Sequence, residues 1–298
     1  MKKAISFICL VICTLIWGTT FIAQETGMEF IGPYVFNGIR FFVGFLALVP
    51  FYFLIEKKKS INEISKNKSK FFFYSVLIGF FLFLGSVFQQ VALIYTDVAN
   101  AAFFTIFYVP MVPIIVFFMF NKNIHWSVWP SVILCVIGGY LLTNFQDATV
   151  RIGDTLVIIG ALFWSLHIIF VGKIIKEFDA PITIGLVQTI VVSFCSLILA
   201  IIFEEFILTN ILKQKIQILY AGILSGGIAF VLQIYAQKNI SPAPSAIIFS
   251  LEGVFATVAA WVILSQILNI NNILGCFFIL LGVLISQLVP LIKKASYK

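Results

Sequence analysis

The sequence predicts an all-α membrane protein with ten transmembrane helices, arranged as two inverted five-helix repeats around a central cavity. Hydrophobic residues make up 61% of the 298 residues and charged residues only 10%, whereas charged residues are about 25% of a typical soluble domain. A helix needs about 20 mostly apolar residues to cross a bilayer. Ten such windows lie at roughly residues 5–23, 33–55, 71–94, 98–120, 127–143, 153–173, 180–203, 217–238, 242–264 and 270–290.

The first window begins directly after two lysines, in "MKKAISFICLVICTLIWG". This arrangement resembles a secretory signal peptide, but the apolar run is about as long as a membrane span and no A-x-A site follows it. We therefore expect it to be a retained first helix. The segments between the later windows are short and polar, so none of them could form a soluble domain.

The basic residues are distributed unevenly between the two sides of the predicted membrane. Fifteen of the 19 lysines and arginines flank the two termini and alternate joints, whereas Arg151, Lys213 and Lys215 flank the other joints and Arg40 lies inside a window. Lysine and arginine are enriched in cytoplasmic segments. The pattern predicts an inner (plasma) membrane protein with both termini in the cytoplasm, which requires an even number of spans. It also indicates that the positive residues behind the net charge of +7 interact with the membrane surface and not with a nucleic acid.

The five cysteines all lie inside apolar windows, without a CxxC pair or a histidine cluster beside them. We expect them to be small packing residues, not a disulfide framework or a metal site. They are Cys9, Cys13, Cys135, Cys195 and Cys276.

The two halves of the chain resemble each other. Trp17 corresponds to Trp164 at an offset of 147 residues, and Pro33 corresponds to Pro181 at an offset of 148. From the third window onward the offset is 144, as between Gln89 and Gln233. The predicted repeats are residues 1–146 and 147–298. Because each holds five spans, the second enters the membrane upside down, a construction typical of secondary transporters.

Two formally charged residues, Arg40 and Glu252, lie deep inside predicted spans. A charge at mid-membrane costs roughly 3 kcal/mol on insertion scales, so such residues face the bundle interior or water. One interpretation is a structural ion pair between them, and the other is a substrate or coupling site. A lone Glu252 could stay protonated and exchange a proton during transport, whereas a neighbouring Arg40 would keep it ionised. The sequence leaves both alternatives open.

Further polar and aromatic residues could line a cavity between the repeats. A tryptophan near the end of a span is often an interface anchor, but the equivalent positions of Trp17 and Trp164 favour a cavity. Uncharged polar groups could bind a substrate there or simply join neighbouring helices. The full set of candidate substrate-binding residues is Trp17, Asn37, Arg40, Gln89, Tyr108, Trp164, His167, Gln188, Gln233 and Glu252.

Two local patterns concern helix geometry. Pro110 and Pro113 fall in the middle of the fourth window, where a missing backbone N–H predicts a kink that could be a hinge or a static bend. Gly222 and Gly226 show the small-xxx-small spacing that favours close helix packing.

The chain contains no GxxxxGK[ST], HExxH or GxSxG motif. We therefore expect neither an enzyme nor a protein with a metal or organic cofactor.

Two longer segments identify a family. "LIWGTTFIAQETGMEFIGPYVFNGIRF", with Trp17, Gly18, Pro33 and Arg40, and "SLEGVFATVAAWVIL", with Glu252, resemble the EamA-type drug/metabolite transporter (DMT) superfamily. The resemblance covers essentially the whole chain. It implies ten helices in two repeats, a central cavity and alternating access, with Trp17, Arg40, Trp164 and Glu252 as the best cavity candidates. It does not identify the substrate.

The sequence thus predicts a secondary transporter that moves a small amphipathic metabolite, with an amino acid or related compound or a drug as the substrate and export as the direction. Uptake of a vitamin, sugar or carboxylate is the alternative within the same fold. An intramembrane lipid-modifying enzyme and a non-transporting scaffold are the rivals from other classes. The expected partners are the small-molecule substrate, membrane lipid and a coupling proton. The sequence does not predict the oligomeric state.

Overall fold

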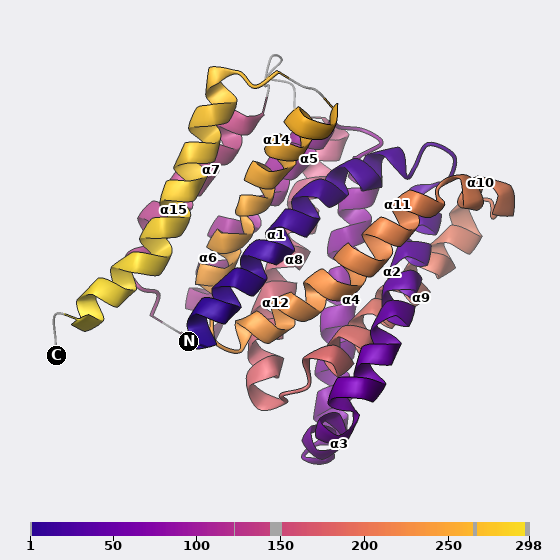
Figure 1. Ribbon diagram of the computed structural model, residues 1–298, viewed down its shortest axis with the longest axis horizontal. Helices are drawn as coiled ribbons and strands as arrows, with labels where there is room; N and C mark the ends of the chain where they lie inside the picture. The colour runs from indigo at the N-terminus through magenta and orange to yellow at the C-terminus, as the bar shows by residue number, and fades with distance from the viewer. Residues whose placement is uncertain (1, 122, 144–150, 265–266, 296–298) are drawn as a thin grey trace.

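The structure of the protein is a computed structural model that describes residues 2–121, 123–143, 151–264 and 267–295 (Figure 1). Within these ranges the chain folds into helices and contains no β-strand. Nine of the described helical segments are long and apolar enough to cross a membrane, and Val128–Leu142 is a shorter apolar helix. The predicted all-α membrane fold is therefore confirmed.

The elements follow the predicted windows. The first half contains α1 (Lys2–Thr26), α2 (Pro33–Phe51), the π-helical segment η1 (Tyr52–Glu56), α3 (Lys57–Ser65), α4 (Lys68–Ala92), α5 (Val98–Thr105), α6 (Tyr108–Phe120) and α7 (Val128–Leu142). The second half contains α8 (Ile152–Glu177), α9 (Pro181–Phe203), α10 (Leu208–Lys213), α11 (Lys215–Tyr220), the π-helical segment η2 (Ala221–Ala229), α12 (Phe230–Gln237), α13 (Pro242–Phe249), α14 (Leu251–Leu264) and α15 (Ile270–Ala295). Proline opens α2, α9 and α13, where its missing N–H costs least.

The windows predicted at 98–120 and 242–264 each form one membrane-length apolar segment, but each contains an irregular turn that separates two named helices. Ile106 (φ −58°, ψ −14°) directly follows α5, and Ser250 (φ −59°, ψ −16°) directly follows α13. Both keep right-handed helical dihedrals, and they are equivalent positions at the 144-residue offset. In the first half Pro110 has no N–H to donate to the Ile106 carbonyl. The second half has Val254 at the equivalent position, so proline alone does not cause the turn. An irregular turn within a span therefore recurs at equivalent positions in the two halves.

α11, η2 and α12 together form the span predicted at 217–238, and its glycines allow close contact with α2. A Cβ atom added to Gly222 would lie 2.6 Å from the Arg40 carbonyl oxygen, and one added to Gly44 would lie 2.8 Å from the Gly222 carbonyl oxygen. The close packing predicted from the small-residue spacing is confirmed at Gly222. This close packing places the backbone of Arg40 in direct contact with η2.

The two halves interleave. α2 packs against α9, α4 against α8 and α7 against α15, so each of these pairs joins helices of opposite halves (Figure 1). α1 begins and α15 ends at the end of the bundle where α3 lies, called the α3 end below, and α10 lies at the opposite end, the α10 end. The predicted boundary between residues 146 and 147 lies outside the described residues.

Two glutamates join α2 and α9 at both ends. Glu204, which follows α9, accepts hydrogen bonds from the backbone N–H groups of Tyr34 (2.8 Å) and Val35 (2.7 Å) at the start of α2. Glu56, at the end of η1, accepts them from Ile182 (2.9 Å) and Thr183 (2.7 Å) at the start of α9. Glu56 and Glu204 are related by the 148-residue offset. Each carboxylate thus satisfies unpaired amides at a helix N-terminus, where negative charge is favoured.

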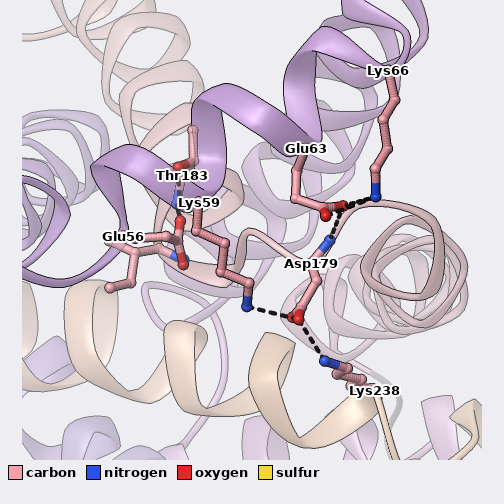
Figure 2. A network of polar contacts seen from close by, with 8 residues as sticks. Glu56, Lys59, Glu63, Lys66, Asp179, Thr183 and Lys238 are labelled. Atoms are coloured by element: carbon pink, nitrogen blue, oxygen red, sulfur yellow. Dashed lines mark hydrogen bonds and ion pairs between the residues drawn. The ribbon is translucent and has the colours of Figure 1, made fainter.

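Polar contacts around Asp179 connect three joints at the α3 end (Figure 2). Asp179 forms ion pairs with Lys59 (2.7 Å) and Lys238 (2.5 Å), and its backbone N–H donates to Glu63 (3.0 Å). Glu63 also pairs with Lys66 at 2.7 Å. The joints that follow α2, α8 and α12 are therefore held together at this end.

Candidate functional site in a cavity between the two repeats

A small cavity of about 50 Å³ lies in the interior between helices of both halves. This volume is well below the roughly 150 Å³ of a protein cavity that holds one benzene molecule. A metabolite could enter only if side chains or helices moved. The lining residues are Trp17, Thr20, Phe21, Gln24, Arg40, Phe41, Gln89, Thr105, Tyr108, Trp164, Ile168, Ser225, Phe230, Gln233, Phe249 and Glu252.

Arg40 reaches the cavity from α2 and is only 4% exposed. Its guanidinium donates to the side-chain oxygen of Asn37 from Nε (3.1 Å) and Nη2 (2.8 Å). It also lies 5.0 Å from the ring centroid of Phe41, a distance at which a cation is attracted to the ring face. Asn37 in turn donates to Ser86 (3.1 Å) and Ser196 (2.9 Å). Asn37 therefore positions Arg40 and does not itself line the cavity.

Glu252 lies in the first turn of α14 and is 6% exposed. Its Oε1 accepts a hydrogen bond from the Tyr108 hydroxyl at 2.9 Å. No ion pair joins Arg40 to Glu252 among the described residues. The structural ion pair considered from the sequence is therefore not formed here. Both residues line the same cavity, each held by a neutral partner.

The two equivalent tryptophans line the cavity from α1 and α8. Both rings pack against Phe230, with ring centroids 5.1 Å from it for Trp17 and 6.1 Å for Trp164. Both indole Nε1 atoms are buried and have no hydrogen-bond partner among the described residues. An unsatisfied buried N–H is costly, so these two donors are available to water or to a bound polar molecule.

Glycine positions explain why the tryptophans fit. A Cβ atom on Gly18 would lie 2.6 Å from the Glu252 carbonyl oxygen, so α1 touches the α14 backbone beside Trp17. A Cβ atom on Gly85 of α4 would lie 3.2 Å from the Trp164 ring. The Trp-Gly pair of the first motif therefore brings Trp17 and Glu252 to the same cavity.

Glutamines supply the uncharged polar wall. Gln89 donates to Thr105 at 2.9 Å, and Gln24 donates to Gln90 at 2.9 Å. Gln233 donates to Gln237 at 3.1 Å, while its own Oε1 is buried without a partner in the described structure. Gln89 thus has satisfied polar atoms, whereas Gln233 offers a free acceptor to the cavity.

Seven of the ten candidate residues from the sequence line the cavity, and three lie behind it. His167 and Gln188 are fully buried and joined at 3.0 Å, and the His167 ring packs edge-on against Trp164 and Phe230. These two residues and Asn37 support the walls. The sequence analysis missed Thr20 and Gln24, although both lie on the Trp17 face of α1 at the helical spacings i+3 and i+7.

A larger crevice of about 370 Å³ lies at the α10 end, between α1, α5, α7 and α14. Glu25, Asp97 and Asn272 supply polar groups to its lining, and Phe21 lines both this crevice and the central cavity. Asp97 is paired with Arg151 at 2.6 Å. The cavity and the crevice therefore adjoin at Phe21.

Both halves of the sequence match a known family. The model of the EamA-like transporter family matches residues 4–144 and again residues 151–288. An uncharacterized transporter of Archaeoglobus fulgidus is 31% identical over 97% of this chain and 87% of its own length. The uncharacterized transporter YoaV of Bacillus subtilis is 25% identical over 91% of this chain and 92% of its own length.

A solved crystal structure has the same fold. It superposes with a TM-score of 0.78 over 95% of this chain and 96% of its own chain, at 14% sequence identity. The family match covers both halves of the sequence and nearly all of its length. The chain therefore belongs to the EamA-like transporter family.

Proposed function

We propose that the protein is a secondary transporter that exports a small amphipathic metabolite across the inner membrane by alternating access. The observation that carries the proposal is the lining of the central cavity. It combines the unpartnered donors of Trp17 and Trp164, the free acceptor of Gln233 and the charges of Arg40 and Glu252, all beside aromatic rings. Ligand sites typically have such apolar walls with a few convergent polar groups.

An amino acid or a related compound is the substrate class that this lining fits best. Arg40 and the two indole N–H groups can bind a carboxylate, and Glu252 can bind an ammonium group. Phe41, Phe230 and Phe249 offer apolar area to a side chain. Phe21 and the larger crevice would then lie on the route between the cavity and the α10 end.

Alternating access is supported by the irregular turns at equivalent positions within two spans. The turns between α5 and α6 and between α13 and α14 lie beside Tyr108 and Glu252, so each turn adjoins the cavity. Transporter sites are commonly built from interrupted helices at a repeat interface. We propose that the α3 end is cytoplasmic, since it carries the lysine-rich joints. In that orientation the Asp179 contacts close the inner side and the crevice faces outward.

Proton coupling through Glu252 is part of the proposal. A buried carboxyl whose partner is the Tyr108 hydroxyl, and not a cation, can take up and release a proton as its surroundings change. Glu252→Gln in proteoliposomes tests this step. The substitution should abolish the dependence of transport on a pH gradient, and a dependence like that of the unaltered protein would rule out Glu252 as the coupling group.

A screen of metabolites by thermal shift of the purified chain, followed by counterflow on the compounds that stabilise it, tests the function as a whole. Counterflow of a stabilising compound supports a transporter, whereas a scaffold would show no substrate-dependent shift. The direction of flux in a deletion strain separates export from the alternative, uptake of a vitamin, sugar or carboxylate. Accumulation of the compound inside the deletion strain is the result expected for an exporter.

A further inference from the structure

A groove of about 190 Å³ lies at the α3 end, between α6, α8 and the start of α13. Its apolar wall consists of Val116, Phe120, Ile169 and Pro242. α8 and α13 are in contact beside it, because a Cβ atom on Gly172 would lie 2.9 Å from the Pro242 ring. The groove is separate from the central cavity, with which it shares no lining residue.

Two lysines of α8, Lys173 and Lys176, line the groove. The Lys173 ammonium donates to the Tyr74 hydroxyl at 3.1 Å and lies 4.8 Å from the Tyr74 ring centroid. It also lies 5.7 Å from the ring centroids of Phe120 and Phe170. Three aromatic rings therefore hold this cation in place without neutralising its charge.

The carboxylates near the groove form ion pairs with other lysines. Glu177 pairs with Lys70 at 2.5 Å, and Asp179 and Glu63 pair with the lysines of Figure 2. Lys173 and Lys176 form no ion pair among the described residues. The groove therefore combines an apolar wall with two uncompensated positive charges, close to the ends of α6 and α8.

We propose that this groove binds an anionic phospholipid. The lipid phosphate lies between Lys173 and Lys176, and the first part of an acyl chain packs against Val116, Phe120 and Ile169. Basic pockets between transmembrane helices bind anionic headgroups. The apolar wall favours a lipid over a free phosphate, because only a lipid has an acyl chain to pack against it. Because the groove and the cavity are separate, this inference does not depend on the transported substrate.

Native mass spectrometry of the detergent-purified full chain tests the proposal. Dioleoyl-phosphatidylglycerol should bind, dioleoyl-phosphatidylcholine should bind more weakly, and soluble glycerol phosphate should not displace bound phosphatidylglycerol at equal concentration. Lys173→Gln with Lys176→Gln should weaken phosphatidylglycerol binding by roughly fivefold for each lysine. Lys173→Arg with Lys176→Arg keeps both charges and should retain phosphatidylglycerol binding. Retained binding shows that the glutamine variant binds weakly because it lost charge and not because it misfolded.

Lys57→Gln with Lys58→Gln is the matched control, since it removes the same charge from the same end of the bundle outside the groove. Phosphatidylglycerol binding should be unchanged in this control. Equal weakening in the control and groove variants would overturn the site, as would equal affinity for phosphatidylcholine. Displacement by glycerol phosphate would show that the groove binds an anion and not a lipid.

Discussion

Tyr108 and Glu252 occupy equivalent positions in the two repeats, 144 residues apart, and their side chains meet in a hydrogen bond of 2.9 Å. Each lies just after the irregular turn within the corresponding span of its own half. Residues that correspond under an internal repeat can touch each other only where the two halves meet. The hydrogen bond therefore lies at the interface of the two repeats, and both residues line the cavity.

Tyr108→Phe removes the hydroxyl group that donates a hydrogen bond to Glu252. Leaving a buried polar group without its partner costs about 1–3 kcal/mol, so we expect a lower melting temperature and weaker binding of the transported compound. Tyr95→Phe is the control, because Tyr95 is 52% exposed. A variant with the stability and affinity of the unaltered protein would show that the hydrogen bond has no role.

Gly18→Ala tests the contact that brings Trp17 beside Glu252. The added methyl would lie 2.6 Å from the Glu252 carbonyl oxygen, so α1 and α14 must separate, at a cost of about 1–3 kcal/mol. We expect reduced stability and transport. Gly226→Ala is the matched control, since the nearest atom to its added Cβ would lie at an ordinary contact distance of 3.5 Å. Equal loss in the two variants would contradict the assigned contact.

Glu56 and Glu204 should stabilise the α2–α9 pair independently. Replacing either carboxylate with glutamine weakens a cap on two backbone amides, and lost caps cost about 0.5–2 kcal/mol. Because the two caps lie at opposite ends of the pair, the losses in the double variant should add. Denaturation of the single and double variants measures this. A double variant no less stable than either single one would show that the caps are not independent.

The ion pairs of Asp179 should make stability depend on acid pH. Burial raises the pKa of the Asp179 carboxyl, but hydrogen bonds from Lys238 and Lys59 outweigh this effect and the pKa lies below its usual range. A lowered pKa in the folded state stabilises the protein above the unfolded pKa of about 3.9, and this stabilisation is lost as pH falls through the folded value.

The melting-temperature difference between the unaltered protein and Asp179→Asn should therefore be constant above about pH 5 and shrink in more acid solution. Glu205→Gln, at an exposed position, should show no such trend. A melting-temperature difference that grows on acidification would contradict the lowered pKa of Asp179.

The sequence predicted the fold well because its strongest signals are global. Apolar windows, the lysine bias and the 144-residue offset fix helix number and arrangement without knowledge of any contact. The contacts were harder to foresee. The sequence left open whether Arg40 and Glu252 pair. In the structure Arg40 is held by Asn37, three residues away in its own helix.

Some details could have been found by applying the repeat further. The 144-residue offset relates Tyr108 to Glu252, and the 148-residue offset relates Glu56 to Glu204. Other details could not, because they depend on packing. The turn between α13 and α14 has no proline at the position equivalent to Pro110, and His167 differs from cavity-lining residues only in the direction in which its helix face points.

Tryptophan fluorescence tests most directly whether the cavity between the repeats binds the transported compound. Trp126, Trp129 and Trp261 are 54%, 41% and 53% exposed, so replacing these three with phenylalanine leaves Trp17 and Trp164 as the emitters. Titration of this variant with a compound active in counterflow should change the emission saturably. The reverse variant, Trp17→Phe with Trp164→Phe, should show no such change, and a saturable signal found only in that reverse variant would contradict the cavity as the binding site.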